Sequence, residues 1–230
     1  MTNDELLPME YTLRQYRAKD RNIRVFYKYQ AFRSYTVNTL ANQMLFLSKY
    51  EQLNDPFDLV LTHLGRNSGD GSLLEKFSNV GIFSVSEHPI SQLMWAHYAD
   101  SYRGMCIGYA AYVVPNPRVL HPVRYIKSVP KKIFKPESLS QQELLEWYLL
   151  SKSRAWSYER EWRFLMGGTV GLVQNVVFPI VEIILGPRMP LDQRVAVIEA
   201  TRATEPSIRV AQPTILNGQI GITLEQWIPP

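Results

Sequence analysis

Short runs of apolar, β-branched and aromatic residues recur along the chain, separated by polar residues, glycine and proline. Alternation with a period of two predicts strands, and apolar residues three or four positions apart predict helices. The expected strands are residues 23–29, 44–48, 80–86, 104–109, 118–126, 161–166, 173–180, 181–185 and 208–210. The expected helices are residues 34–42, 72–78, 90–98, 138 or 140 to 153, and 191–201.

Polar residues and glycines at the ends of these segments predict two local structures. Ser140 followed by Glu143 is the pattern of a capping box, in which the two side chains satisfy free backbone N–H groups at a helix start. The glycines in residues 167–169 predict a hairpin that joins strands 161–166 and 173–180.

The irregular order of strands and helices predicts an α+β fold, with a mixed, mostly antiparallel sheet or sheets flanked by helices. No internal repeat is visible, and no glycine-rich turn of the Rossmann or P-loop type follows a strand. The chain has 230 residues, enough for one large domain or two small ones. No linker divides it, so we expect an N-terminal extension over residues 1–22 and a single α+β domain over residues 23–230.

Composition excludes several classes of protein. With 46% hydrophobic and 20% charged residues, the chain is neither disordered nor fibrous. The single cysteine, Cys106, excludes an internal disulfide and a cysteine metal site, and no histidine has metal-ligand spacing, so no metal is expected. The longest apolar stretch, residues 176–185, is too short to span a bilayer, and no secretory signal is visible, so we expect a cytoplasmic protein without a membrane partner.

A net charge of +4 makes the chain only mildly basic, and its positive charges are scattered. That is weaker than the concentrated positive field of a dedicated nucleic-acid binder. Lys127, Lys131, Lys132 and Lys135 form the better of two candidate phosphate-binding patches, although solvated lysines explain them as well.

Two serines are the first candidates for a site. Ser84 and Ser86 lie two positions apart in an expected strand, so their hydroxyls project to one face. Such a pair can hold a ribose or orient a neighbouring carboxylate. Hydroxyls that only satisfy backbone groups at the end of the strand are the alternative.

An aromatic segment is the second candidate. Trp95, His97 and Tyr98 fall within one expected helix, and Tyr102 follows it. Aromatic rings so close together suit stacking on a ligand ring with hydrogen bonds at its rim. A packed amphipathic helix would use the same residues, and for Trp95 this interpretation is favoured.

The segment of residues 156–163 combines tryptophan, glutamate and arginine and is the least generic in the chain. In an extended segment Glu159 and Glu161 share one face, where mutual repulsion raises the pKa of one carboxyl and suits acid–base work. The alternative is that each glutamate forms an ordinary salt bridge with a nearby arginine, such as Arg154 or Arg163.

Seven segments combine into a specific pattern along the chain. They are, in order, Phe26-Tyr27-Lys28-Tyr29, Leu53-Asn54-Asp55-Pro56-Phe57-Asp58, Ile82-Phe83-Ser84-Val85-Ser86-Glu87, Leu93-Met94-Trp95-Ala96-His97-Tyr98-Ala99-Asp100 with Gly104, Trp156, Tyr158-Glu159-Arg160-Glu161-Trp162-Arg163, and Ile183-Ile184-Leu185-Gly186-Pro187-Arg188-Met189. Together they resemble the bacterial family catalogued as domain of unknown function 2971, over about residues 25–201. The resemblance implies a bacterial or phage cytoplasmic protein from a family often found near mobile elements and defence genes. Asn54 and Asp55 enter the candidate site through this resemblance.

The order of three polar segments is also similar to that of ADP-ribosyltransferases. That resemblance implies that NAD is bound by a first-strand residue and a serine strand, and that the last glutamate stabilises an oxocarbenium-like transition state. This chain departs from the ADP-ribosyltransferase pattern at two places. Its first strand carries Tyr-Lys-Tyr, and Val85 stands where that family has threonine. By position, the first-strand residue is Tyr27 or Tyr29, the serines are Ser84 and Ser86, and the acids are Glu159 and Glu161.

The sequence therefore supports two functions. One is an enzyme of the ADP-ribosyltransferase type that cleaves NAD as its substrate, acting as a toxin or phage-defence effector on a nucleic-acid or protein acceptor. The other is a non-catalytic module of the same fold that binds a nucleotide-type small molecule, a nucleic acid or a partner protein. The expected catalytic residues are Glu161, Glu159 and His97, and the expected ligand-binding residues are Tyr27, Tyr29, Ser84, Ser86, Trp95, Tyr98, Asn54, Asp55 and Arg163.

Overall fold

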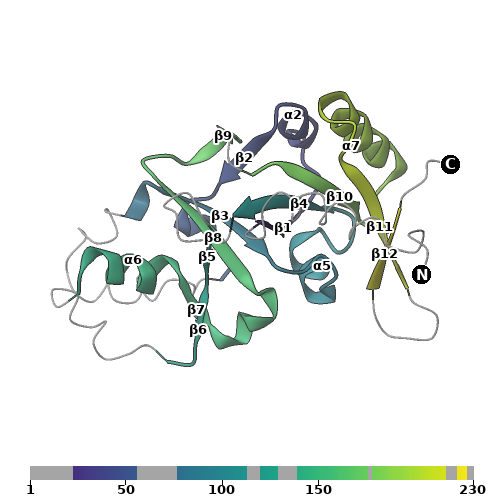
Figure 1. Ribbon diagram of the computed structural model, residues 1–230. Coiled ribbons are helices and arrows are strands. Elements are labelled where there is room, and N and C mark those ends of the chain that lie inside the picture. Colours follow the sequence, from purple (N-terminus) through teal and green to yellow (C-terminus); the bar gives the residue numbers. More distant parts are fainter. Residues whose placement is uncertain are drawn as a thin grey trace. The chain divides into compact units, whose positions relative to one another are not determined.

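The computed structural model describes residues 23–55, 77–112, 120–128, 139–175, 178–215 and 222–226 (Figure 1). The chain forms two compact units. Unit 1 comprises Met1–Met44, Val85–Val119 and Gln174–Pro230, and unit 2 comprises Leu45–Ser84 and Leu120–Val173. The expected extension over residues 1–22 lies outside the described residues, and the single domain over residues 23–230 stays a prediction.

Unit 1 is built on a sheet in the order β12-β11-β10-β4-β1, with the end of β3 pairing to β1 through Ser86 and Tyr27. Its pairs are antiparallel except for β10 and β11, which α7 connects as a parallel crossover. The strands are β1 (Ile23–Gln30), β3 (Val80–Ser86), β4 (Met105–Tyr112), β10 (Ile180–Leu185), β11 (Arg209–Ile215) and β12 (Ile222–Gln226), and the helices are α2 (Thr36–Ala41), α5 (Gln92–Tyr98) and α7 (Leu191–Thr204).

The centre of unit 1 is buried because its strands are apolar on both faces. Every residue of β10 is buried, as expected of a central strand with structure on either side. The α2 and α7 helices lie side by side (Figure 1), and the Thr204 hydroxyl donates to the Ala41 carbonyl at 3.1 Å.

Unit 2 holds the strand order β3-β8-β5 and a short parallel pair, β6 and β7. A small core forms where Phe77, Ile82, Tyr148 and Leu149 pack together. Its further elements are η1 (Tyr50–Gln52), β5 (His121–Pro122), β6 (Arg124–Ile126), α6 (Gln141–Leu149), β7 (Ser151–Ser153), η4 (Arg154–Glu159) and β8 (Glu161–Gly167), and β2 (Met44–Leu47) pairs with β9 (Gly171–Gln174).

The predicted mixed α+β fold with mostly antiparallel pairing is confirmed. The capping box at Ser140 and Glu143 is also confirmed, with both of its hydrogen bonds formed. The hairpin between strands 161–166 and 173–180 is wrong: β9 pairs with β2, and β8 neighbours β3 and β5. Gly168 and Gly171 both have positive φ, a backbone conformation that glycine adopts readily.

The predicted strand over residues 118–126 is interrupted, and the helix expected to end at residue 153 stops at Leu149. Pro122 has no N–H for a sheet, and Val123 donates to the Glu161 carbonyl at 2.9 Å, so β5 and β6 are separate. Residues 151–153 pair with β6, and tertiary pairing therefore overrides the helical pattern there.

Candidate functional site

Four charged side chains form a buried network in unit 2. Lys152 comes from β7, Glu159 from the end of η4, and Glu161 and Arg163 from β8. All four are buried, and Arg163 has no exposed surface. Burial of charged groups on this scale requires that each be paired and hydrogen-bonded.

Arg163 and Glu161 form a two-point pair. Nε of Arg163 donates to Oε1 of Glu161 at 2.7 Å, and Nη2 donates to Oε2 at 3.0 Å. The remaining guanidinium nitrogen, Nη1, donates to the Leu149 carbonyl at 2.8 Å. This arrangement fixes the Glu161 carboxylate in one orientation.

Lys152 links the two glutamates. Its ammonium nitrogen lies 2.5 Å from Oε2 of Glu159 and 3.2 Å from Oε2 of Glu161. With Arg163, the network has two positive and two negative charges, so its formal charge is zero. Both oxygens of Glu161 are bound to cations.

The charge state of Glu161 follows from this geometry. Burial alone would raise the pKa of its carboxyl, but Arg163 and Lys152 outweigh burial, and the pKa is lowered to about 2, with a further contribution from the Ser84 hydroxyl. Glu161 is therefore ionised at neutral pH and has no proton to donate. The sequence-based expectation that repulsion between Glu159 and Glu161 raises a pKa is wrong for Glu161, because the cations lie nearer than that argument assumed.

Acid is expected to remove the stabilisation that ionised Glu161 contributes. Since the pKa of Glu161 is lower in the folded protein than in the unfolded chain, this stabilisation is complete above about pH 4.5 and is lost as the pH falls towards 2. It amounts to about 3 kcal/mol. Urea unfolding of the wild type and Glu161→Gln should show a stability difference that shrinks between pH 6 and pH 2.5. A difference that stays constant over this range would contradict the assigned charge state.

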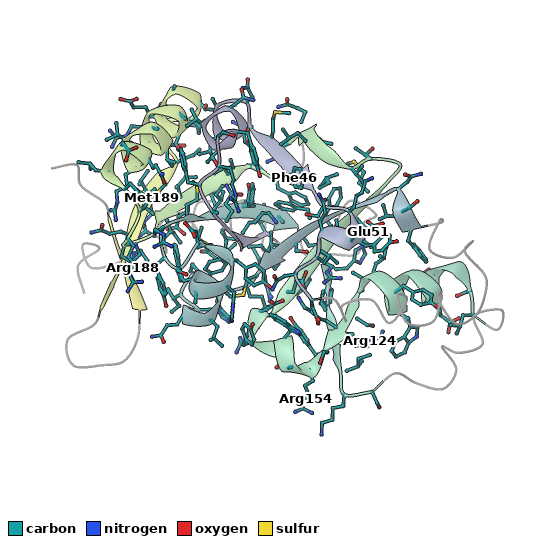
Figure 2. All side chains as sticks on the ribbon, turned by 180° about the vertical axis from the view of Figure 1, so that it is seen from behind. Phe46, Glu51, Arg124, Arg154, Arg188 and Met189 are labelled. Atoms are coloured by element: carbon teal, nitrogen blue, oxygen red, sulfur yellow. The ribbon has the colours of Figure 1, made fainter. Side chains whose placement is uncertain are left out.

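Aromatic and basic side chains surround the network in the same segment. Trp156 and Tyr158 are half-buried, with ring centroids 6.0 Å apart, and the Lys152 ammonium lies 5.1 Å from the Trp156 ring centroid. Arg154, labelled in Figure 2, and Arg160 are exposed. Residues 154–160 thus carry two half-buried rings and two exposed guanidinium groups.

The remaining candidates of the serine and tyrosine strands lie in unit 1. The Tyr29 hydroxyl donates to the His88 carbonyl at 2.6 Å and accepts from the Ser91 N–H at 3.2 Å. The Ser86 hydroxyl accepts from the His88 N–H at 3.3 Å. Both side chains therefore hold the backbone that follows β3, which is the structural alternative stated for the serine pair.

Trp95 is part of the unit 1 core. It has no exposed surface, and its indole N–H donates to the Pro89 carbonyl at 2.9 Å. Its ring stacks on Tyr102 at 6.0 Å and meets the Tyr29 ring edge-on at 5.4 Å. The packing interpretation of Trp95 is therefore favoured over stacking on a ligand.

Two candidates remain in α5 and two near η1. His97 is exposed and Tyr98 is half-buried, with their rings edge-to-face at 6.4 Å. Asn54 is exposed and Asp55 is buried. Among the described residues, no group of three potential metal ligands comes together.

Tyr27 belongs to a second buried charged group, which the sequence did not single out. The Tyr27 hydroxyl hydrogen-bonds Glu182 of β10, and Glu182 pairs with Arg209 of β11. Burial is the main cause of the raised pKa of Tyr27. A glutamate inside the apolar run of residues 180–185 was the available signal for this pair.

The structure therefore brings Ser84, Glu159, Glu161 and Arg163 together in unit 2, with Lys152 as the member that sequence analysis missed. Lys152 lay inside a predicted helix, where a lysine indicates a solvated face. The convergence of these residues with Tyr27, Tyr29 and Ser86 on one site stays a prediction.

No helix among the described residues is both long enough and apolar enough to cross a membrane. Comparisons with curated proteins and with solved structures find no significant match. Residues 94–164, which include most of α5, all of α6 and the whole ion-pair network, match the family described as protein of unknown function (DUF2971).

Proposed function

We propose that this protein is a non-catalytic module that binds a nucleotide-type ligand on the outer side of η4. The observation that carries this proposal is the pairing of the network. An anion that stabilises a developing positive charge must be uncompensated where that charge forms. Glu161 is held between Lys152 and Arg163, so its charge is already balanced.

The surface beside the network has the groups that a nucleotide needs. A base can stack on the half-buried Trp156 ring, and such stacking contributes about 1–3 kcal/mol per base. The exposed Arg154 and Arg160 guanidinium groups suit phosphate oxygens. The buried network holds η4 and the start of β8 in fixed positions behind this surface.

Cleavage of NAD in the manner of ADP-ribosyltransferases is the second candidate function. It is favoured by one contact, since the Ser84 hydroxyl helps to hold the Glu161 carboxylate ionised, which is one of the two roles considered for the serine pair. In this scheme the bond between nicotinamide and ribose breaks, nicotinamide leaves with the bonding electron pair, and Glu161 faces the cationic ribose carbon. Water or a nucleophile of the acceptor then bonds to that carbon and loses its proton. The ligand would first have to draw Lys152 or Arg163 away from Glu161.

One experiment separates the two functions. The full chain is titrated with NAD, AMP and a short single-stranded oligonucleotide, while thermal denaturation reports binding and released nicotinamide reports turnover. We expect at least one ligand to raise the melting temperature, Trp156→Ala to weaken its binding at least tenfold, and no nicotinamide release. Trp147→Ala is the matched control, because Trp147 is a half-buried tryptophan of the same unit that stacks under Arg124 instead.

Nicotinamide release that disappears in folded Glu161→Gln would establish the second function in place of the first. Equal weakening by Trp156→Ala and Trp147→Ala would remove the η4 surface from the proposal. Neither stabilisation nor turnover with any of the three ligands would contradict both functions.

A further inference from the structure

A polar row crosses the sheet of unit 1 and shares no residue with the proposed function. The register places Ser86, Tyr27, Gly108, Glu182 and Arg209 side by side on β3, β1, β4, β10 and β11. Directly paired residues project to the same face of a sheet. The row therefore lies on one face of the sheet.

Gly108 has no side chain, and this allows the Tyr27 side chain to reach Glu182 across β4. A Cβ at this position would lie 3.2 Å from Cε1 of Tyr27 and 3.2 Å from Cβ of Glu182. The Tyr27 ring therefore passes over β4 and reaches the Glu182 carboxyl, to which its hydroxyl hydrogen-bonds. On the other side of Glu182, Nη1 of Arg209 donates to Oε1 at 2.5 Å.

The other edge of the Arg209 guanidinium is unsatisfied within the described part of the chain. Nε and Nη2 are both buried and have no hydrogen-bond partner there, and the side chain is only 6% exposed. Buried charged donors without an acceptor are costly, so native proteins supply a protein group, a water or a ligand to them.

Arg163 shows what this edge of a guanidinium binds. The same two atoms of Arg163, Nε and Nη2, donate to the two oxygens of Glu161 at 2.7 and 3.0 Å. The edge matches a group with two oxygens about as far apart as those of a carboxylate or phosphate. Among the described residues, no group with two such oxygens pairs with Nε and Nη2 of Arg209.

Charge and position favour an anion at this edge. Burial is the largest influence on the pKa of Glu182 and raises it, while Arg209 and the Tyr27 hydroxyl lower it. Arg209 is also the first residue of β11, and the pairing of β11 with β12 runs from Ala211 to Ile215. Among the described strands, only β10 lies beside Arg209.

We propose that Arg209 forms an oxyanion-binding site in unit 1, which takes the phosphate or carboxylate group of a small ligand through Nε and Nη2. The Glu182 carboxyl, which itself hydrogen-bonds the Tyr27 hydroxyl, holds the guanidinium through Nη1. This site is independent of the η4 surface, and either can fail without the other.

The test is a titration of the full chain with inorganic phosphate and, separately, with acetate, at constant ionic strength set by chloride. Thermal denaturation and the Nε–H resonance of Arg209 in nitrogen-15 NMR report binding. We expect one of the two anions to stabilise the wild type with saturation and to shift that resonance. Phosphate and acetate in separate arms distinguish the two classes of ligand.

Arg209→Lys keeps the positive charge and loses the two-point edge, so it should weaken binding at least tenfold. Arg194→Lys is the control, because all three nitrogens of the half-buried Arg194 already donate, to Met189, Gln212 and Gly186. If Arg209→Lys does not fold, the wild-type resonance decides. An unmoved resonance, or equal binding by Arg209→Lys and wild type, would show that water satisfies Arg209 and would overturn the proposal.

Discussion

Arg163→Met is expected to lower the free energy of unfolding by about 3–5 kcal/mol. Among the described residues, the substitution leaves buried Glu161 with Lys152 as its one remaining cation, and Lys152 also pairs with Glu159. It also removes the donor to the Leu149 carbonyl. An unpaired buried charge has lost its water without a protein partner in return, so most of the cost comes from Glu161. Urea unfolding at neutral pH measures the effect.

Arg124→Met is the matched control. Arg124 also pairs with a glutamate of unit 2, Glu146 at 3.6 Å, but the two side chains are 50% and 39% exposed. Water and salt screen such a pair, so its loss should cost at most about 1 kcal/mol. Removing both members of the buried pair, in Arg163→Met with Glu161→Gln, should restore much of the stability. Equal losses for Arg163→Met and Arg124→Met would mean that the network contributes nothing.

The same network governs how the functional test of Glu161 is interpreted. Glu161→Gln keeps the shape of the side chain and one hydrogen-bond acceptor, but it leaves Arg163 with no carboxylate. A loss of activity or binding therefore counts only if thermal denaturation shows a folded protein. This coupling is typical of a charged group that organises a fold, and it is a further physical reason to prefer binding over catalysis.

Local patterns predicted the elements that depend on local interactions. The Ser140 capping box forms because both of its partners lie within one helical turn. The apolar run before Gly186 forms a fully buried strand because it has no polar face to expose. The α+β class followed from the irregular order of such elements.

The sequence did not predict ion-pair partners that only strand pairing brings together. Lys152 joins the two glutamates only because residues 151–153 pair with β6 and leave the helical pattern of α6. Arg209 meets Glu182 only through the register between β10 and β11. In both cases the local sequence predicts only an ordinary charged position. Strand pairing then brings an ion-pair partner that does not belong to the same short segment.

Two glycines of unit 1 allow the backbone of neighbouring segments to come close together. Gly104 and Gly186 approach each other closely, and the Gly186 N–H donates to the Gly104 carbonyl at 2.9 Å. Next to them, the turn of Asp100, Ser101 and Tyr102 has three consecutive positive φ angles of 48°, 51° and 72°, which are uncommon outside glycine. Specific sequence in these segments is thus explained without a ligand.

Gly186→Ala is expected to cost about 4 kcal/mol or more, which is exceptional for one methyl group. A Cβ at Gly186 would lie 2.2 Å from the Tyr102 carbonyl oxygen and 2.5 Å from that of Gly104, both of them backbone atoms. Neither carbonyl group can move away easily. The Tyr102 carbonyl also accepts from the N–H of Arg188, labelled in Figure 2, and the Tyr102 ring stacks on Trp95. Gly167→Ala is the control: no atom lies within 4 Å of its Cβ position, so urea unfolding should show a change within about 1 kcal/mol. Similar stabilities for Gly186→Ala and Gly167→Ala would mean that the backbone around Gly186 and Tyr102 can move to accommodate a methyl group. The contact between these two turns would then not fix the position of α5.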